Sequence, residues 1–74
     1  MTETKELELK NLGNRLRKYR LSKNFSQETL AEVSNLDRTY ISGLERGKRN
    51  PSFLILKKLS QILNINPNQL FEDE

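Results

Sequence analysis

Apolar residues recur every three to four positions along the chain, whereas the strict alternation of apolar and polar residues that is typical of strands is weak. This period predicts amphipathic helices. Capping residues, prolines and glycines divide the pattern into five helical segments. The expected segments are 5–22, 27–34, 38–46, 53–63 and a short fifth one from residue 67. The sequence therefore predicts an all-α fold, a compact five-helix domain that takes up residues 1–74.

The starts of the segments are marked in the sequence. Side chains suited to cap a helix N-terminus precede the second, third and fourth segments, at Ser26, Asp37 and Ser52. At the fifth segment, Asn66 stands before Pro67 and Gln69, which is the pattern of a capping box with proline in the first turn. Gly47 is expected to end the third segment. Gly13 weakens the first segment and could mark the true start of that helix.

Two charged residues continue apolar helix faces. Arg20 follows Leu16 by four positions on the first segment, and Glu45 follows Ile41 by four positions on the third. Residues at this spacing share a helix face. Burying either charge alone is costly, so we expect Arg20 and Glu45 to form an ion pair that fixes the third helix against the first. The alternative is that both charged groups reach water past their apolar neighbours.

Composition excludes several classes of function. The 74 residues include no cysteine and no histidine, which excludes disulfides, zinc sites with these ligands and histidine catalysis. The sequence has no glycine-rich phosphate loop and no convergent pair of carboxylates, so we expect no enzyme, no metal and no cofactor. The apolar runs are far shorter than the roughly 20 residues of a membrane span. Residues 1–10 lack an apolar signal core, so we expect a cytoplasmic protein with no membrane partner.

Charge is distributed unevenly along the chain. The stretch 10–58 holds twelve basic and four acidic residues, a net charge of +8. The two ends together hold one basic and six acidic residues, a net charge of −5. A basic centre favours a polyanionic partner such as nucleic acid. The alternative on charge alone is a set of solvated helix faces with no partner of this kind.

Two of the expected helices are short and closely spaced. About three residues join 27–34 to 38–46, and Leu36 is placed to fill the angle between them. So short a connection forces a tight crossing, which is the geometry of a helix-turn-helix. In such a unit the second helix enters the major groove of DNA while the first crosses the backbone. The sequence thus predicts a helix-turn-helix over about 27–46 and double-stranded DNA as a partner.

The outer face of the segment 38–46 carries the expected base contacts. Its inward residues are Ile41, Leu44 and Glu45, and its outward residues are Arg38, Thr39, Ser42 and Arg46. Arginine can donate two hydrogen bonds to guanine, and threonine can bond to base edges or touch a thymine methyl group. Gly43 lies in the middle of this segment, where glycine costs roughly 1 kcal/mol relative to alanine. Either a close approach requires glycine there, or it is a tolerated substitution.

Hydrogen-bond donors follow the third segment in a loop. They are Arg46, Lys48, Arg49 and Asn50. Such groups suit DNA phosphates, although an ordinary polar loop has a similar composition. Ser26 and Gln27 stand at the start of the second segment, where free backbone N–H groups can also bind a phosphate.

Taken together, these motifs resemble the lambda-repressor/Cro-like helix-turn-helix regulators, also called the xenobiotic-response-element family. The likeness rests on residues 26–31, 41–47, 51–52, 56–59 and 67–71, and it extends over about residues 10–72. The resemblance implies a five-helix DNA-binding domain with a structural salt bridge between Arg20 and Glu45.

The resemblance also implies particular contacts to DNA. Base contacts would fall on Arg38, Thr39, Tyr40 and Ser42, and backbone contacts on Gln27, Arg46, Lys48 and Asn50. One position departs from the family pattern. Gly43 stands where a base-contacting side chain is common, so base reading is expected to concentrate at the start of the third helix.

Residues 34–42 further resemble the controller proteins of restriction–modification systems, which are short homodimers that activate and repress promoters. We therefore expect a sequence-specific transcription regulator that acts as a homodimer on a two-fold operator, with RNA polymerase as a further partner. The dimer interface is expected at Ile65, Leu70 and Phe71, because these apolar residues exceed what one small core can cover.

Two other interpretations keep the same fold. In the first, the main partner is another protein, as for an antitoxin, and DNA binding is secondary. In the second, the chain is a basic architectural protein whose affinity for DNA does not depend on sequence.

Overall fold

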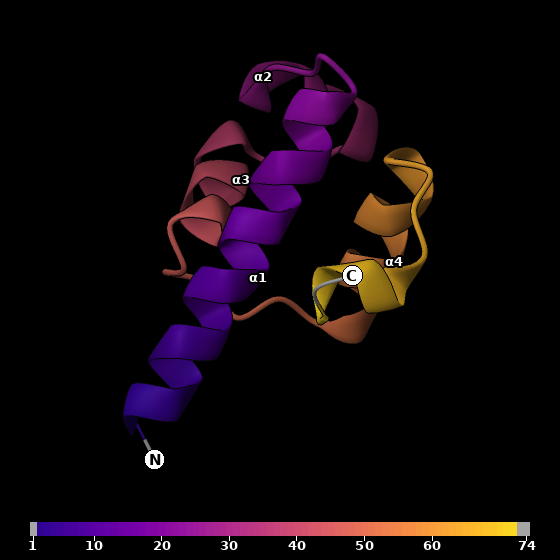
Figure 1. Cartoon of the computed structure of the whole chain (residues 1–74). Coiled ribbons are helices and arrows are strands. Elements are labelled where there is room, and N and C mark those ends of the chain that lie inside the picture. Colours follow the sequence, from indigo (N-terminus) through magenta and orange to yellow (C-terminus); the bar gives the residue numbers. More distant parts are fainter. Residues whose placement is uncertain (1, 73–74) are drawn as a thin grey trace.

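The computed structural model describes residues 2–72, which fold into four α-helices and one turn of 3₁₀ helix (Figure 1). The elements are α1 (Thr2–Ser22), α2 (Gln27–Ser34), α3 (Arg38–Glu45), α4 (Phe53–Ile62) and the 3₁₀ helix η1 (Pro67–Leu70). No strand occurs within residues 2–72. The prediction of an all-α fold is confirmed, and the expected fifth helix is present as a 3₁₀ turn.

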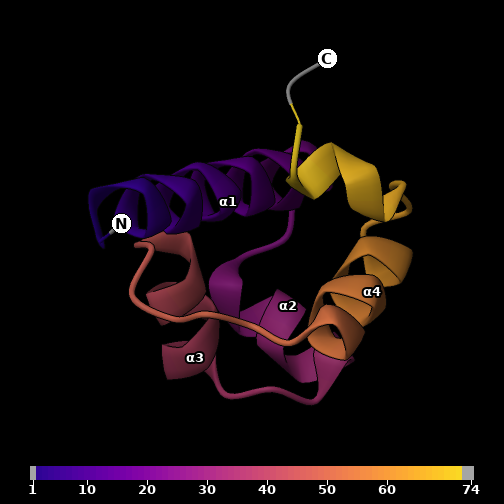
Figure 2. The same ribbon diagram turned by 90° about the horizontal axis from the view of Figure 1, so that it is seen from below.

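The five elements close into a ring around one core. α1 packs on α3 and η1, α2 packs on α3 and α4, and α4 packs on η1. Figure 2 shows this closure, with α1 and η1 on one side and the other three helices facing them. The core consists of aliphatic side chains: Leu12, Leu16, Leu30, Ala31, Ile41, Leu44, Leu56, Leu59, Leu63 and Leu70. Because helices of 8 to 10 residues are not stable alone, each short helix depends on its two neighbours in the ring.

Side-chain caps begin three of the elements, as the sequence predicts. The Oγ of Ser26 accepts a hydrogen bond from the backbone N–H of Thr29 at 2.9 Å. The Oγ of Ser52 accepts one from the first turn of α4 at 3.2 Å. At η1, Asn66 and Gln69 form a complete capping box. These bonds satisfy N–H groups that have no partner within their own helix.

Asp37 begins α3 in a different way from the one expected. Its carbonyl oxygen accepts hydrogen bonds from Tyr40 N at 3.0 Å and Ile41 N at 3.1 Å, but its side chain forms no capping bond. Asp37 is therefore the N-cap residue of α3, as the sequence predicts, but its side chain does not supply the capping bond. The first N–H groups of α3 are left without a side-chain acceptor, and groups of this kind attract anions.

Gly13 lies inside α1, which is continuous from Thr2 to Ser22, so the alternative of a helix that starts at Gly13 is wrong. Helix packing accounts for this glycine. A Cβ atom built at Gly13 would overlap the carbonyl oxygens of Leu44 and Glu45, and it would lie 2.6 Å from the second of these. α1 and α3 thus cross backbone against backbone at this point. This contact outweighs the weak helix propensity of glycine.

One residue that the sequence places in a dimer interface belongs to the core. The side chain of Leu70 has no exposed area, so this part of the prediction was wrong. Because η1 is tied to α1 by a hydrogen bond of 3.4 Å from Arg15 Nη1 to Leu70 O, the turn directs Leu70 inward. Of the other two predicted interface residues, Ile65 is half-buried and Phe71 is exposed.

Candidate nucleic-acid interface

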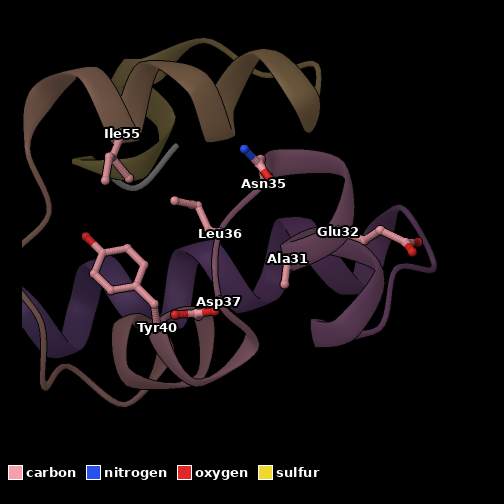
Figure 3. Close-up of a pocket in the computed structure, with 7 residues that line it drawn as sticks. All are labelled: Ala31, Glu32, Asn35, Leu36, Asp37, Tyr40 and Ile55. Atoms are coloured by element: carbon pink, nitrogen blue, oxygen red, sulfur yellow. The ribbon is translucent and has the colours of Figure 1, made fainter.

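A tight turn joins α2 to α3 and sets the angle between them. Asn35 adopts the left-handed conformation with φ of 59°, and the N–H of Leu36 donates back to Ala31 O at 2.9 Å. Figure 3 shows Leu36, Tyr40 and Ile55 pointing toward the space between this turn and α4. Leu36 is partly buried and packs against the core. It therefore fills the angle between α2 and α3, and the two helices form a helix-turn-helix.

A buried ion pair fixes the end of α3 against α1. Arg20 Nε donates to Glu45 Oε2 at 2.6 Å, and Arg20 Nη2 donates to Glu45 Oε1 at 3.0 Å. The third guanidinium nitrogen donates to Phe25 O at 2.7 Å. Gln27, at the start of α2, adds a hydrogen bond from its Nε2 to Glu45 Oε1 at 3.1 Å. The pair expected from the sequence is thus present, and its four hydrogen bonds hold α1, α2 and α3 in one orientation.

The outer face of α3 is polar and open to solvent. Arg38 and Thr39 are exposed, and Ser42 is half-buried. Tyr40 is also half-buried and turns toward α4 (Figure 3). The inner face of the helix is buried throughout: Ile41, Leu44 and Glu45. Donors and acceptors therefore project from a helix whose orientation is fixed from behind, which is what the reading of base edges requires.

The loop after α3 is shaped by its backbone. Gly47 has φ of 74°, a conformation that favours glycine. Lys48 N donates to Gly43 O at 2.8 Å, which folds the loop back against the helix. The loop exposes four side chains with hydrogen-bond donors: Arg46, Lys48, Arg49 and Asn50. We call the outer face of α3 (residues 38, 39 and 42) together with these four loop residues the α3 surface.

A known family matches this arrangement. The family model described as helix-turn-helix matches residues 16–70, more than half of the chain. The chain belongs to the helix-turn-helix family. The control protein C.MunI of Mycoplasma sp is 48% identical to it over 62 residues, which are 82% of this chain and 84% of C.MunI. The control protein C.BamHI of Bacillus amyloliquefaciens is 48% identical over 61 residues, which are 81% of this chain and 75% of C.BamHI.

Solved structures of helix-turn-helix proteins have the same fold. The restriction-modification controller protein C.AhdI from Aeromonas hydrophila matches with a TM-score of 0.84 and 49% identity, over 88% of this chain and 98% of that chain. SinR, the master regulator for biofilm formation, matches in a complex with DNA with a TM-score of 0.79 and 34% identity. That match covers 82% of this chain and 98% of the SinR chain. These likenesses confirm the resemblance that the sequence motifs indicate.

The start of α2 in this helix-turn-helix protein uses its polar side chains internally. Ser26 Oγ accepts from Thr29 N and also donates to Thr29 Oγ1 at 2.9 Å. Gln27 uses its amide N–H on Glu45. Both residues still border an open hollow that Arg38 also lines. A phosphate placed there would meet the free backbone N–H groups of α2 and the Arg38 side chain, whereas the Ser26 hydroxyl is already engaged.

Sequence reasoning missed two contacts at the edge of the α3 surface. The stem of Lys10, on α1, lies against Gly47: a Cβ atom built on that glycine would be 2.9 Å from Lys10 Cγ. The Cζ atom of Arg49 lies 5.8 Å from the centre of the Tyr40 ring, which is within cation–π range. Each contact joins residues from different segments of this helix-turn-helix protein, so no local sequence pattern indicates it.

Neither a membrane-spanning helix nor a metal-binding cluster occurs within residues 2–72. No helix in that range is long and apolar enough to cross a bilayer. No group of His, Cys, Asp and Glu side chains in the same range could hold a metal ion.

Proposed function

We propose that this chain is a sequence-specific DNA-binding transcription regulator that acts as a homodimer on a two-fold operator. The observation that carries the proposal is the α3 surface, from which Arg38 and Thr39 project into solvent. The buried Arg20–Glu45 pair fixes the opposite face of this helix against α1. Donors held in a fixed orientation are what base reading requires. The likeness to SinR in complex with DNA supports double-stranded DNA as the partner.

The proposed contacts divide into two kinds. Base contacts are proposed for Arg38, Thr39 and Ser42, with Tyr40 at the edge of that face. Phosphate contacts are proposed at the start of α2, through the backbone N–H groups at Ser26 and Gln27, and in the loop, through the side chains of Arg46, Lys48 and Asn50. In this arrangement the phosphate contacts fix the register of the protein on the duplex, and the residues of α3 supply the sequence preference.

The dimer interface is proposed on the apolar surface formed by the start of α4 and the C-terminal end. Phe53, Leu54 and Phe71 are 64%, 73% and 48% exposed. Phe53 and Phe71 also line one groove. Apolar area of this extent favours a protein partner, and half-buried Ile65 remains a candidate contact. Two copies related by a two-fold axis would place their α3 helices about 34–36 Å apart, one turn of B-DNA.

The regulated genes are proposed to be those of a restriction–modification system. The likeness to the control proteins C.MunI and C.BamHI and to the restriction-modification controller protein C.AhdI supports this role. A regulator that activates from a site beside a promoter acts on RNA polymerase, which we include as a further partner. The proposed place of action is the cytoplasm, where both partners are present.

Selection from a random duplex library tests the function. The wild-type protein should enrich two inverted half-sites. On the enriched duplex, Arg38→Ala should weaken binding by about 1–3 kcal/mol and relax the base preference at one position of each half-site. Lys57→Ala removes the same charge from the exposed face of α4 and is the control. Equal losses for the two variants, on enriched and random duplexes alike, would contradict the proposal.

A further inference from the structure

Gly43 is buried although it lies beside the exposed face of α3. The cover is the side chain of Arg49, from the loop that follows the helix. A Cβ atom built at Gly43 would lie 2.9 Å from Arg49 Cγ, 3.4 Å from its Nε and 3.7 Å from its Cδ. The Arg49 side chain therefore runs along α3 in direct contact with the backbone of Gly43, at a distance that only glycine allows.

The head of the same side chain rests on an aromatic ring. Arg49 Cζ is 5.8 Å from the centre of the Tyr40 ring, and Tyr40 precedes Gly43 by three positions, so the two are neighbours on the helix surface. Among the described residues, the Arg49 guanidinium contacts this ring and forms no hydrogen bond or ion pair. Contact with a ring uses the flat side of the guanidinium and leaves its N–H donors available for other acceptors.

The Arg49 side chain covers position 43, which lies on the same face of α3 as the proposed base contact Thr39. Gly43 follows Thr39 by four positions, and residues at that spacing share a face of the helix. Arg49 thus lies where a longer side chain at position 43 would project. The loop supplies the side chain that the helix lacks there.

We propose that Gly43 and Tyr40 are positioning residues that hold Arg49 beside Thr39, where its guanidinium reads a guanine edge. This inference rests on the proposed function, because it adds a base contact to the same surface. It also moves Arg49 from the phosphate contacts expected from the sequence to the base contacts. The planar fork of N–H donors matches the O6 and N7 acceptors of guanine.

Positioning matters because arginine is flexible. A free arginine on a loop loses rotamer freedom when it binds, and that loss weakens affinity. In the structure without DNA, the aliphatic part of Arg49 already contacts Gly43 and its guanidinium already contacts Tyr40. A methyl group at position 43 would lift the stem away from the helix and displace the guanidinium from the ring.

The test is a double-mutant cycle on a duplex that wild-type protein enriches from a random library. Arg49→Ala should weaken binding to this duplex by about 5- to 150-fold, the range of one lost bidentate base contact. Gly43→Ala should weaken it by about three- to ten-fold. In the Arg49→Ala background, Gly43→Ala should have no further effect, because the side chain that it displaces is gone.

Thermal unfolding separates positioning from folding. Gly43→Ala should not lower the melting temperature, because its new methyl group meets a flexible side chain and alanine favours the helix. A second pair of variants tests the ring. Tyr40→Phe keeps the aromatic face and should keep the coupling to Arg49, whereas Tyr40→Leu should abolish it.

Several results would overturn the inference. Additive losses for Gly43→Ala and Arg49→Ala would mean that the two residues act independently. Equal losses for Arg49→Ala on the enriched and a random duplex would place Arg49 on phosphates instead of a base. Wild-type affinity in Arg49→Ala, together with lost affinity in Arg38→Ala, would refute this inference and leave the proposed function standing. If the wild-type protein enriches no sequence, the proposed function itself fails.

Discussion

α3 and α4 have similar lengths, 8 and 10 residues, yet they present opposite chemistry to solvent. α3 begins with exposed Arg38 and Thr39, whereas α4 begins with exposed Phe53 and Leu54. Charged and polar side chains suit a hydrated, anionic partner such as DNA. Exposed apolar side chains suit a protein surface. The contrast supports the proposed division of binding, with DNA on α3 and a second copy of the chain on α4.

The inner faces of the two helices differ as well. α3 is held by the hydrogen bonds of Glu45, which set its direction as well as its distance from α1. The buried residues of α4 are Leu56, Leu59 and Ser60, and the Ser60 hydroxyl donates to its own helix, at Lys57 O. Within residues 2–72, α4 is therefore held against the other elements by apolar packing. Directional hydrogen bonds thus lie behind the helix that we propose reads DNA.

The largest expected effect comes from breaking the pair behind α3. Glu45→Ala leaves Arg20 charged and buried without its partner, so we expect a loss of about 3–5 kcal/mol in the free energy of unfolding. Urea denaturation followed by circular dichroism measures this loss. Glu28→Ala removes an exposed carboxylate from α2 and should change the same quantity by less than about 0.5 kcal/mol. Unchanged stability in Glu45→Ala would show that the pair does not hold α3.

Replacing both partners with apolar residues separates stability from orientation. In Arg20→Met combined with Glu45→Leu, no buried charge remains, so most of the free energy of unfolding should return. The directional hydrogen bonds are absent, so affinity for the enriched duplex should stay below that of the wild type. If the double variant binds DNA as tightly as wild type, packing orients both helices and the contrast between α3 and α4 disappears.

The next largest effect is expected at one of two glycines. Gly13 lies on α1 and contacts the backbone of α3, whereas Gly43 lies within α3. Gly13→Ala would drive a methyl group into carbonyl oxygens of α3, which belong to the backbone and cannot move aside. We expect a loss of about 1–3 kcal/mol in the free energy of unfolding, as for an overpacked core. Gly43→Ala is the matched control, because the atoms nearest to its methyl group belong to the flexible Arg49 side chain. Similar losses in both variants would mean that Gly43 has a packing role.

The local elements of this fold could be predicted from the sequence. Ser26 and Ser52 begin their helices as expected because a capping bond involves residues only three positions apart. The pair of Arg20 and Glu45 could also be predicted, although it joins residues 25 positions apart. Each charge interrupts an apolar stripe, and opposite charges on two inner faces satisfy each other.

Other features depended on contacts that no local pattern indicates. From the sequence alone, Gly13 predicts a weakened helix, because glycine has a low helix propensity. The sequence does not show that the backbone of α3 crosses α1 at this residue. Leu70 and Phe71 are adjacent apolar residues, and the direction of a single 3₁₀ turn places one in the core and the other in solvent. The contact of Arg49 with Gly43 depends on how the loop folds back, which only the assembled structure specifies.

A smaller effect is expected on the α4 side. Leu54→Ser removes the most exposed side chain of the proposed interface, so we expect dimerisation to weaken by about 1–2 kcal/mol, as for a residue of moderate importance in an interface. Sedimentation equilibrium over a range of concentrations measures the shift toward monomer. Leu21→Ser changes an exposed leucine of α1 and is the control. A shift in both variants, or in neither, would place the interface elsewhere.

The smallest expected effect concerns the loop. Lys48 holds the loop through its backbone N–H, which donates to Gly43 O at 2.8 Å, so Lys48→Ala removes a charge without reshaping the backbone. Because a phosphate contact carries no sequence information, affinity should fall by the same factor, roughly two- to five-fold, on enriched and random duplexes. The slope of log affinity against log salt should decrease by about 1. Lys58→Ala should leave that slope unchanged, because it lies on the exposed face of α4, away from the proposed DNA contacts of α2, α3 and the loop. A loss confined to the enriched duplex would instead place Lys48 among the base contacts, and the loop and α3 would then read sequence together.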